Sequence, residues 1–163
     1  MVNFQAFHGT VTMISDFMIG VNGDEEGCYT LMSVDNGNGN LVNFVVSPTT
    51  YFVDHAMVSV GDKVTGYYDG NAATPLIFPP QYRALVVVKE HPNQNVKVDF
   101  FNSQLESSDG HLKLNISPYT PLLLINGQPF TKNPANRNLI VIYGPTTRSI
   151  PAQTTPYEII IWC

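Results

Sequence analysis

Charged side chains are scarce in this sequence. Asp, Glu, Lys and Arg together make up 13% of the 163 residues, whereas an average soluble domain has roughly 25%. Lys and Arg number only 8, and the formal net charge is −5 at pH 7. Binding to a phosphate backbone depends on clustered positive charge, so nucleic acid is excluded from the expected partners. A surface with so little charge also repels neighbouring molecules only weakly.

Long apolar runs are missing as well. The first residues, MVNFQAFHGTVTMISDF, contain no Lys or Arg and no stretch long enough for a signal peptide or a membrane span. We therefore expect a protein that is made in the cytoplasm and does not insert into a membrane; a leader that has been removed would leave the same sequence. Hydrophobic residues still account for 44% of the chain, so a packed core is expected.

Cysteine occurs twice, as Cys28 and Cys163, which is too few for a disulfide framework. Cys28 is expected to be a small buried hydrophobic residue. Cys163 ends the sequence, and a thiol at an exposed terminus can react with a neighbouring molecule. Both are candidates for a cross-link between molecules, with Cys163 the stronger of the two.

Arrangements that carry catalysis or hold metals are also lacking. The histidines at positions 8, 55, 91 and 111 form no HxH or HxxxH pair, and no GxSxG motif is present. The acidic cluster GDEEG (Gly23–Gly27) lacks the regular spacing of a calcium loop and is expected to be a solvated turn. We therefore expect no metal, no cofactor and no catalytic activity.

What the sequence does contain is an internal repeat. Three motifs recur in the same order at nearly the same spacing. They are FVVSPTTYFV (Phe44–Val53) and LNISPYTPLLL (Leu114–Leu124), VTGYYDG and LIVIYGP with strands that end on Tyr68 and Tyr143, and FPPQ (Phe78–Gln81) and IPAQ (Ile150–Gln153). We infer two diverged copies, residues 1–91 and 92–163, joined near EHPNQN.

Each half contains short segments rich in Val, Ile, Tyr and Phe and bounded by Gly, Pro and Asn, which is typical of strands. The expected strands lie near Thr10–Ile14, Tyr29–Val34, Leu41–Val46, Lys63–Tyr68, Arg83–Lys89, Val96–Phe101, Gln104–Ser107, His111–Ile116, Leu139–Tyr143 and Tyr157–Trp162. A sustained 3.6-residue period is absent, so the class is all-β. A hairpin after the second strand and a long crossover after the third predict two tandem five-stranded OB-like Greek-key barrels. A β-sandwich of ten short strands is the alternative.

A proline-rich loop precedes the last strand of each half. Proline cannot donate to a sheet, so FPPQ and IPAQTTP are expected outside the sheet or at its edge. We expect each loop to close one end of its barrel, with Phe78 or Ile150 as a buried plug. A ligand-binding loop is the alternative.

Two stretches carry a resemblance: NFVVSPTTYFVDHAMVSVGDKVTGYYDGNAATPLIFPPQYRALVVV and NRNLIVIYGPTTRSIPAQTTPYEIII. They resemble an uncharacterised family of tandem OB-like β-barrel proteins from spore-forming Gram-positive bacteria, clostridial and related. Some members of that family precede copper-amine-oxidase-N-terminal-like repeats in surface proteins. The resemblance spans nearly the whole chain. It implies an association with the spore or the cell envelope and supplies no catalytic residues.

Aromatic and arginine side chains near strand ends are the candidate ligand-binding residues. They are Tyr67, Tyr68, Tyr82 and Arg83 in the first half and Tyr143 and Arg148 in the second. Such side chains form stacking faces for sugars or bases on OB barrels. Because side chains alternate across a strand, about half of these rings are alternatively expected in the core.

Self-association is the function that these features favour. The last expected strand, YEIIIW, carries one charge, Glu158, and is followed by Cys163. Natural monomers usually guard their edge strands with charge or proline. We therefore expect a non-catalytic structural building block that forms homo-oligomers or filaments through this strand, in the spore or cell envelope. A carbohydrate- or small-ligand-binding OB-like module is the alternative.

Overall fold

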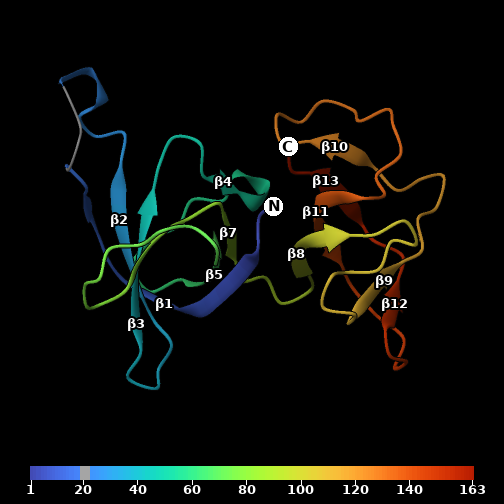
Figure 1. Ribbon diagram of the computed structural model, residues 1–163, viewed down its shortest axis with the longest axis horizontal. Coiled ribbons are helices and arrows are strands. Elements are labelled where there is room, and N and C mark those ends of the chain that lie inside the picture. Colours follow the sequence, from blue (N-terminus) through green and yellow to red (C-terminus); the bar gives the residue numbers. More distant parts are fainter. Residues whose placement is uncertain (19–22) are drawn as a thin grey trace. The chain divides into compact units, whose positions relative to one another are not determined.

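The computed structural model describes residues 1–18 and 23–163 and consists mainly of β-strands (Figure 1). The all-β class expected from the sequence is confirmed. The chain divides into two compact units, Met1–Glu90 and His91–Cys163. Two short 3₁₀ turns, η1 (Gly23–Glu25) and η2 (Val53–His55), lie in the first unit.

One sheet contains the strands of the first unit. They are β1 (Phe4–Asp16), β2 (Thr30–Asp35), β3 (Leu41–Val46), β4 (Tyr51–Phe52), β5 (Lys63–Asp69), β6 (Gln81–Arg83) and β7 (Val86–Lys89). Their order in the sheet is β4-β7-β5-β1-β2-β3-β6. The β3–β6 and β4–β7 pairs are parallel, and the other neighbours are antiparallel.

The segment 81–89 bonds to two separate parts of this sheet. β6 and β7 are interrupted only by Ala84 and Leu85. The Ala84 N–H donates to the Val45 carbonyl on β3 at 3.0 Å, and the next N–H, of Leu85, donates to the Tyr67 carbonyl on β5 at 2.8 Å. One continuous segment therefore connects β3 with β5, although β1 and β2 separate these strands in the sheet order.

The second unit shows the same succession of pairings, with shorter strands in place of β1 and β3. Its strands are β8 (Asn95–Phe101), β9 (Leu112–Leu114), β10 (Leu122–Leu124), β11 (Arg137–Tyr143), β12 (Ala152–Thr154) and β13 (Glu158–Ile161). β8, β11, β13 and β10 form one sheet, and β9 and β12 form a parallel pair. The predicted strand 104–107 is present only as isolated bridges, from Ser107 to Phe101 and from Glu106 to Lys113.

The repeated SPTT and SPYT motifs fold into the same turn. In the first unit the Ser47 N–H donates to the Thr50 hydroxyl at 3.0 Å. In the second unit the Ser117 N–H donates to the Thr120 hydroxyl at 3.1 Å. A short strand follows each turn, β4 or β10, and runs parallel to the last strand of its unit. Both short strands lie in segments that were expected to be crossovers.

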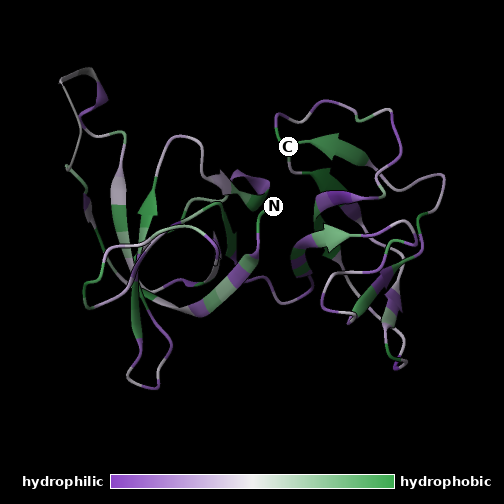
Figure 2. Cartoon of the chain, viewed as in Figure 1, coloured by the Kyte–Doolittle hydropathy of each residue, from purple (hydrophilic) through white to green (hydrophobic). Residues whose placement is uncertain are grey.

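Each unit has its own hydrophobic core. Hydrophobic residues concentrate on the strands, whereas the hairpin between β2 and β3 is polar (Figure 2). In the first unit the buried ring of Phe44 lies directly over Gly66, where a Cβ would come within 2.5 Å of the ring. This close approach explains why a glycine is placed in the middle of β5.

The expectation that Phe78 and Ile150 are buried plugs is wrong. The Phe78 side chain is 87% exposed and that of Ile150 is 91% exposed. In the first unit, half-buried Tyr68 and Tyr82 already pack against the core. The loop lies outside the sheet, and its end is held by a hydrogen bond from the Asn43 N–H to the Pro80 carbonyl at 2.9 Å. The Phe78–Pro79 and Ile150–Pro151 peptide bonds are both cis.

The expectation that the C-terminal strand is an open edge is also wrong. β13 lies between β10 and β11 and pairs with both. Its residues Ile159, Ile160 and Ile161 are buried. The reason is that the crossover contributes β10, which covers the side of β13 that was expected to be open.

The expectation that Cys28 is buried is wrong as well. Cys28 is exposed, as is Cys163. Cys28 lies in the turn between η1 and β2, where its N–H donates to the Glu25 carbonyl at 2.9 Å. Turn residues of this kind face solvent because their backbone groups lie outside the sheet.

Asp109 organises the turn before β9. Its carboxylate accepts hydrogen bonds from the Ser107 hydroxyl at 2.6 Å and the His111 N–H at 3.0 Å, and it forms an ion pair with Lys97. Burial alone would raise the pKa of Asp109, but Lys97, Ser107 and the His111 N–H together lower that pKa to about 2.

We expect Phe78→Ala to change the free energy of unfolding by less than about 0.5 kcal/mol, because the ring is exposed. The matched control, Phe44→Ala, removes a buried ring and is expected to cost about 3–5 kcal/mol. Urea unfolding followed by circular dichroism measures both. A loss for Phe78→Ala as large as the control's would contradict the exposed position of the loop.

We further expect the second unit to lose stability as the pH falls from 3.8 toward about 2. The pKa of Asp109 is lower in the folded state, so its stabilising contribution is complete above its unfolded value and is lost as the carboxylate is protonated. Asp109→Asn should therefore be less stable at neutral pH and less sensitive to acid. Fluorescence of Trp162, the single tryptophan, reports on this unit. If the wild type and Asp109→Asn lost stability equally in acid, the stabilising role of the Asp109 carboxylate would be refuted.

Candidate functional site

A polar pocket in the first unit contains two of the residues that the sequence singled out. It has a volume of about 330 Å³. Its wall includes Tyr68 from β5 and Tyr82 from β6. Its polar side chains are those of Asn3, Gln5, Asp69 and Thr74. We call this the tyrosine pocket.

The two tyrosines are brought together by the pairing of β6 with β3. Tyr82 is the register partner of Phe44, whose ring is tilted against Tyr68 at 6.2 Å. The rings of Tyr68 and Tyr82 stack with centroids 3.9 Å apart and planes 6° from parallel. Burial raises the pKa of Tyr68, and the neighbouring Tyr82 phenol raises it further. Tyr68 is therefore a neutral phenol at physiological pH and can donate as well as accept.

The polar side of the tyrosine pocket is held in place by local hydrogen bonds. The Gln5 amide donates to the Asn3 side-chain oxygen at 3.1 Å. Asp69 Oδ1 accepts from the N–H groups of Asn3, at 3.0 Å, and Asn71, at 2.9 Å. These two bonds lower the pKa of Asp69, so it is a carboxylate at neutral pH. Amide, carboxylate and phenol groups thus meet in one hollow.

The other predicted ligand-binding residues lie elsewhere. Tyr67 precedes Tyr68 on β5, and Arg83 follows Tyr82 on β6. Successive side chains of a strand point to opposite faces of the sheet, so neither residue shares the face of its neighbouring tyrosine. Arg83 is exposed, and neither residue lines the tyrosine pocket. Asn3, Gln5 and Asp69 were not among the predicted site residues. Gln5 lies in the part of β1 that precedes Thr10, where the first strand was expected to begin, and Asp69 lies one residue beyond the expected end of β5.

The second unit does not repeat the tyrosine pair. Tyr143 packs half-buried against its core, and both burial and the charge of Asp109 raise the pKa of Tyr143. Counting from the repeated prolines, Thr154 stands where the first unit has Tyr82. Its hydroxyl donates to the Pro145 carbonyl at 2.9 Å. Arg148 lies exposed in the loop before β12.

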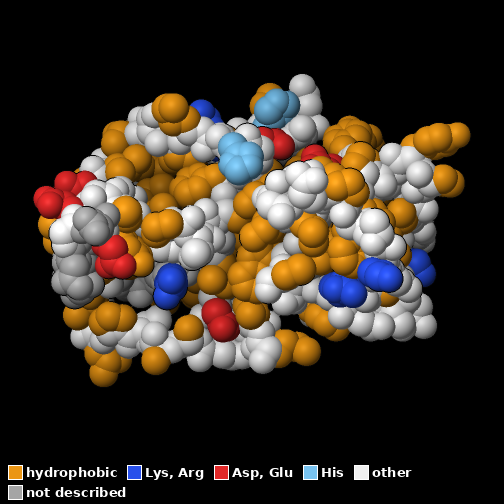
Figure 3. Space-filling model, turned by 90° about the horizontal axis from the view of Figure 1, so that it is seen from above, with side chains coloured by type: hydrophobic (Ala, Val, Ile, Leu, Met, Phe, Trp, Pro, Cys, Tyr) orange, Lys and Arg blue, Asp and Glu red, His pale blue; other side chains and the backbone are white. Residues whose placement is uncertain are grey.

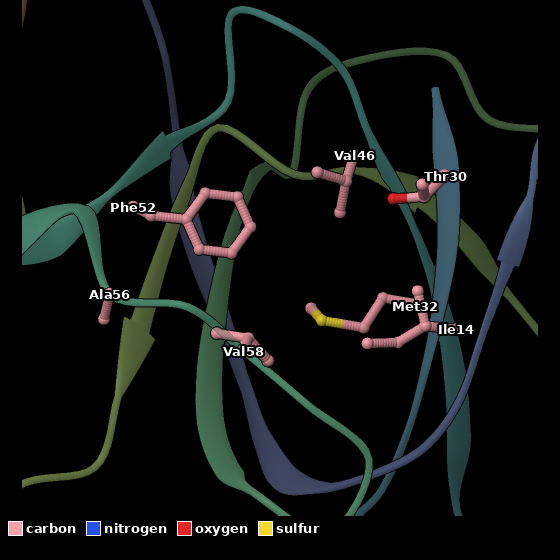
Figure 4. A pocket seen from close by; sticks show the side chains of 7 residues that line it. All are labelled: Ile14, Thr30, Met32, Val46, Phe52, Ala56 and Val58. Carbon is pink, nitrogen blue, oxygen red and sulfur yellow. The ribbon is translucent and has the colours of Figure 1, made fainter. Parts of the chain in front are cut away.

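A second hollow in the first unit is apolar (Figure 4). Its volume is about 210 Å³. Its lining consists of Ile14, Thr30, Met32, Val46, Phe52, Ala56 and Val58. The side chains of Met32, Phe52 and Val58 point toward the common space. Within this described lining, Thr30 supplies the single hydroxyl group. We call this hollow the apolar pocket.

The apolar pocket was not predicted from the sequence. Phe52 and Val58 lie in the crossover, which was expected to be a loop. The run TYFV, which begins at Thr50, is the available signal, because two large apolar residues in a connecting segment need a place to pack.

Among residues 1–18 and 23–163, His, Cys, Asp and Glu side chains form no group of three or more that could hold a metal ion. In the same part of the chain, no helix is long and apolar enough to cross a membrane.

The fold and its pockets define an all-β protein of two units, with polar and apolar hollows in the first. Comparisons of the chain with family models, with curated proteins and with solved structures find no match. The resemblance to a family of spore-forming bacteria therefore stays a prediction that rests on the two stretches quoted above.

Proposed function

We propose that the protein is a non-catalytic binding module whose first unit takes a carbohydrate in the tyrosine pocket. The observation that carries the proposal is the meeting of Tyr82 with the polar side chains of Asn3, Gln5 and Asp69 in one hollow. Sugars present an apolar face and a ring of hydroxyl groups. An aromatic ring packs on the apolar face of a sugar, and amides and carboxylates form hydrogen bonds with its hydroxyl groups.

The composition of the pocket favours binding over hydrolysis of a sugar. Glycoside hydrolysis typically uses two carboxyl groups on either side of the bond that is cleaved. In the described lining of the tyrosine pocket, Asp69 is the one carboxylate. The pKa of Asp69 is lowered, which suits a hydrogen-bond acceptor and not a general acid.

The scaffold in this proposal is a pair of OB-like barrels that arose by duplication, residues 1–91 and 92–163. The equal succession of strand pairings and the equivalent turns at Ser47 and Ser117 support the duplication. The bridging of β3 and β5 by segment 81–89 supports a barrel, because the last strand of an OB-fold occupies this place. Ligands of OB-folds bind on the barrel face or its loops, near strand ends such as those of Tyr68 and Tyr82.

Self-association as a structural building block is the second candidate. Its support is the exposure of large apolar side chains in the proline-rich loops, including Leu76, Phe78 and Ile150. Apolar side chains exposed together are typical of interaction surfaces. The resemblance stated above implies a location in the spore or cell envelope for either function.

The carbohydrate proposal is tested by nuclear magnetic resonance titration of the full chain. The probes are glucose, N-acetylglucosamine and their β-1,4-linked oligomers, each added alone. We expect at least one probe to shift resonances of Tyr68 and Tyr82. We expect Gln5→Ala and Tyr82→Phe to weaken its binding roughly twofold to tenfold, the effect of losing one hydrogen bond.

Gln5 is exposed and Tyr82→Phe keeps the ring, so both variants should fold as the wild type does. Tyr119→Phe is the control, since Tyr119 is an exposed tyrosine of the second unit. If no probe shifts the two tyrosines, or if the control weakens binding as much as the pocket variants, the proposal fails.

A further inference from the structure

The first unit exposes an unusual amount of apolar surface in two places. The loop before β6 presents Leu76 at 103% and Phe78 at 87% exposure, so these side chains contact almost nothing in their own chain. On the segment that contributes Ala56 and Val58 to the apolar pocket, Met57 and Val60 are also largely exposed. Figure 3 shows hydrophobic side chains gathered on the upper face of the first unit. The loop before β6 is a projection, and the apolar pocket is a hollow.

We infer that the apolar pocket receives the Phe78 ring of a second copy of this chain. An apolar cavity of about 150 Å³ is large enough to bind benzene. The apolar pocket, at about 210 Å³, therefore has room for one phenyl ring. Leu76 of the same loop then covers Met57 and Val60 at the rim.

The chemistry of the two surfaces matches. Residues 74–80, TPLIFPP, carry no charge, and neither do the residues that line the apolar pocket. The pocket itself therefore contributes no charged group, and the Thr30 hydroxyl is the one polar side chain of its described lining. Beside the pocket, the Lys89 ammonium donates to the Met57 carbonyl at 3.3 Å and is partly exposed. Pro75, Pro79 and Pro80 restrict the loop, so little conformational entropy is lost when it docks.

The projection and the hollow lie on different parts of the unit. The loop is tied to β3 by the bond between Asn43 and Pro80, whereas the pocket lies at the end of the β2–β3 pair where Thr30 is the partner of Val46. One contact therefore leaves a free loop on one molecule and a free pocket on the other. Such a contact is heterologous and extends into rings or open chains of molecules, whereas two molecules that exchange both loops at once form a closed symmetric dimer.

The area available sets the strength of the contact. An aromatic side chain buries roughly 150–250 Å². With Leu76 and the rim, each side then contributes about half of the roughly 800 Å² per partner found in stable complexes. We therefore expect a weak contact and assembly that grows with concentration.

The experiment uses two complementary variants of the full chain in analytical ultracentrifugation. Phe78→Ser removes the projection and keeps the pocket. Ala56→Leu fills the pocket and keeps the projection. Ile150→Ser is the control, because Ile150 is equally exposed but lies in the loop of the second unit.

We expect the wild type and Ile150→Ser to form increasingly large species as concentration rises, and each complementary variant to remain monomeric. An equal mixture of the two variants should form a dimer that does not grow, since only one loop and one pocket are functional in it. The dimer also shows that Ala56→Leu is folded. Carbohydrate binding at the tyrosine pocket should be unchanged in Ala56→Leu and Ile150→Ser, whose substitutions lie outside that pocket and the loop that contributes Thr74 to it, so this test and that of the proposed function fail separately.

A mixture that stays monomeric, or a Phe78→Ser variant that assembles like the wild type, overturns the inference. So does a wild type that is monomeric at millimolar concentration while toluene shifts the methyl resonances of Met32 and Val58. That result would assign the pocket to a small apolar molecule instead of a second copy.

Discussion

The first unit depends on the hydrogen bonding of two neighbouring residues. Ala84 donates to β3 and Leu85 donates to β5, so a single segment satisfies backbone groups on two strands that are not adjacent in the sheet. Backbone donors in a core must be paired. Because the segment bonds first to β3 and then to β5, these donors are paired without a further strand. It also fixes Tyr82 opposite Phe44 and against Tyr68. The tyrosine pocket is thus a direct result of how the sheet is completed.

The strands that could be predicted from sequence are those with a clear β pattern and sharp boundaries. β3 was expected at Leu41–Val46 and lies there, between a polar hairpin and the SPTT turn. β4 and β10 have only two and three residues, which is too short for any periodicity to be recognised. Missing β10 led directly to the wrong expectation for β13, because the position of a strand in a sheet depends on partners that the sequence does not reveal. The exposure of Phe78 was unpredictable for the same reason: its neighbours in space were unknown.

The candidate site was predicted in part. Tyr68 and Tyr82 were named because they are aromatic residues at strand ends, and they do lie in one pocket. Arg83 was named for its closeness in sequence, but alternation along β6 separates it from Tyr82. The two units differ at this point, since Thr154 stands at the position of the second tyrosine in the motif comparison and its hydroxyl bonds to the Pro145 carbonyl. A repeat in sequence therefore predicts a repeated fold better than a repeated site.

The shortness of the outer strands has a consequence for aggregation. In the first unit the sheet ends on β4 and β6, of two and three residues. Stacking of chains into cross-β fibrils requires segments of about six or seven residues with free backbone groups. Neither edge offers such a template, although the chain has little charge with which to keep other molecules away. In the first unit, the protection of the sheet edges against cross-β stacking therefore comes from strand length and not from electrostatic repulsion.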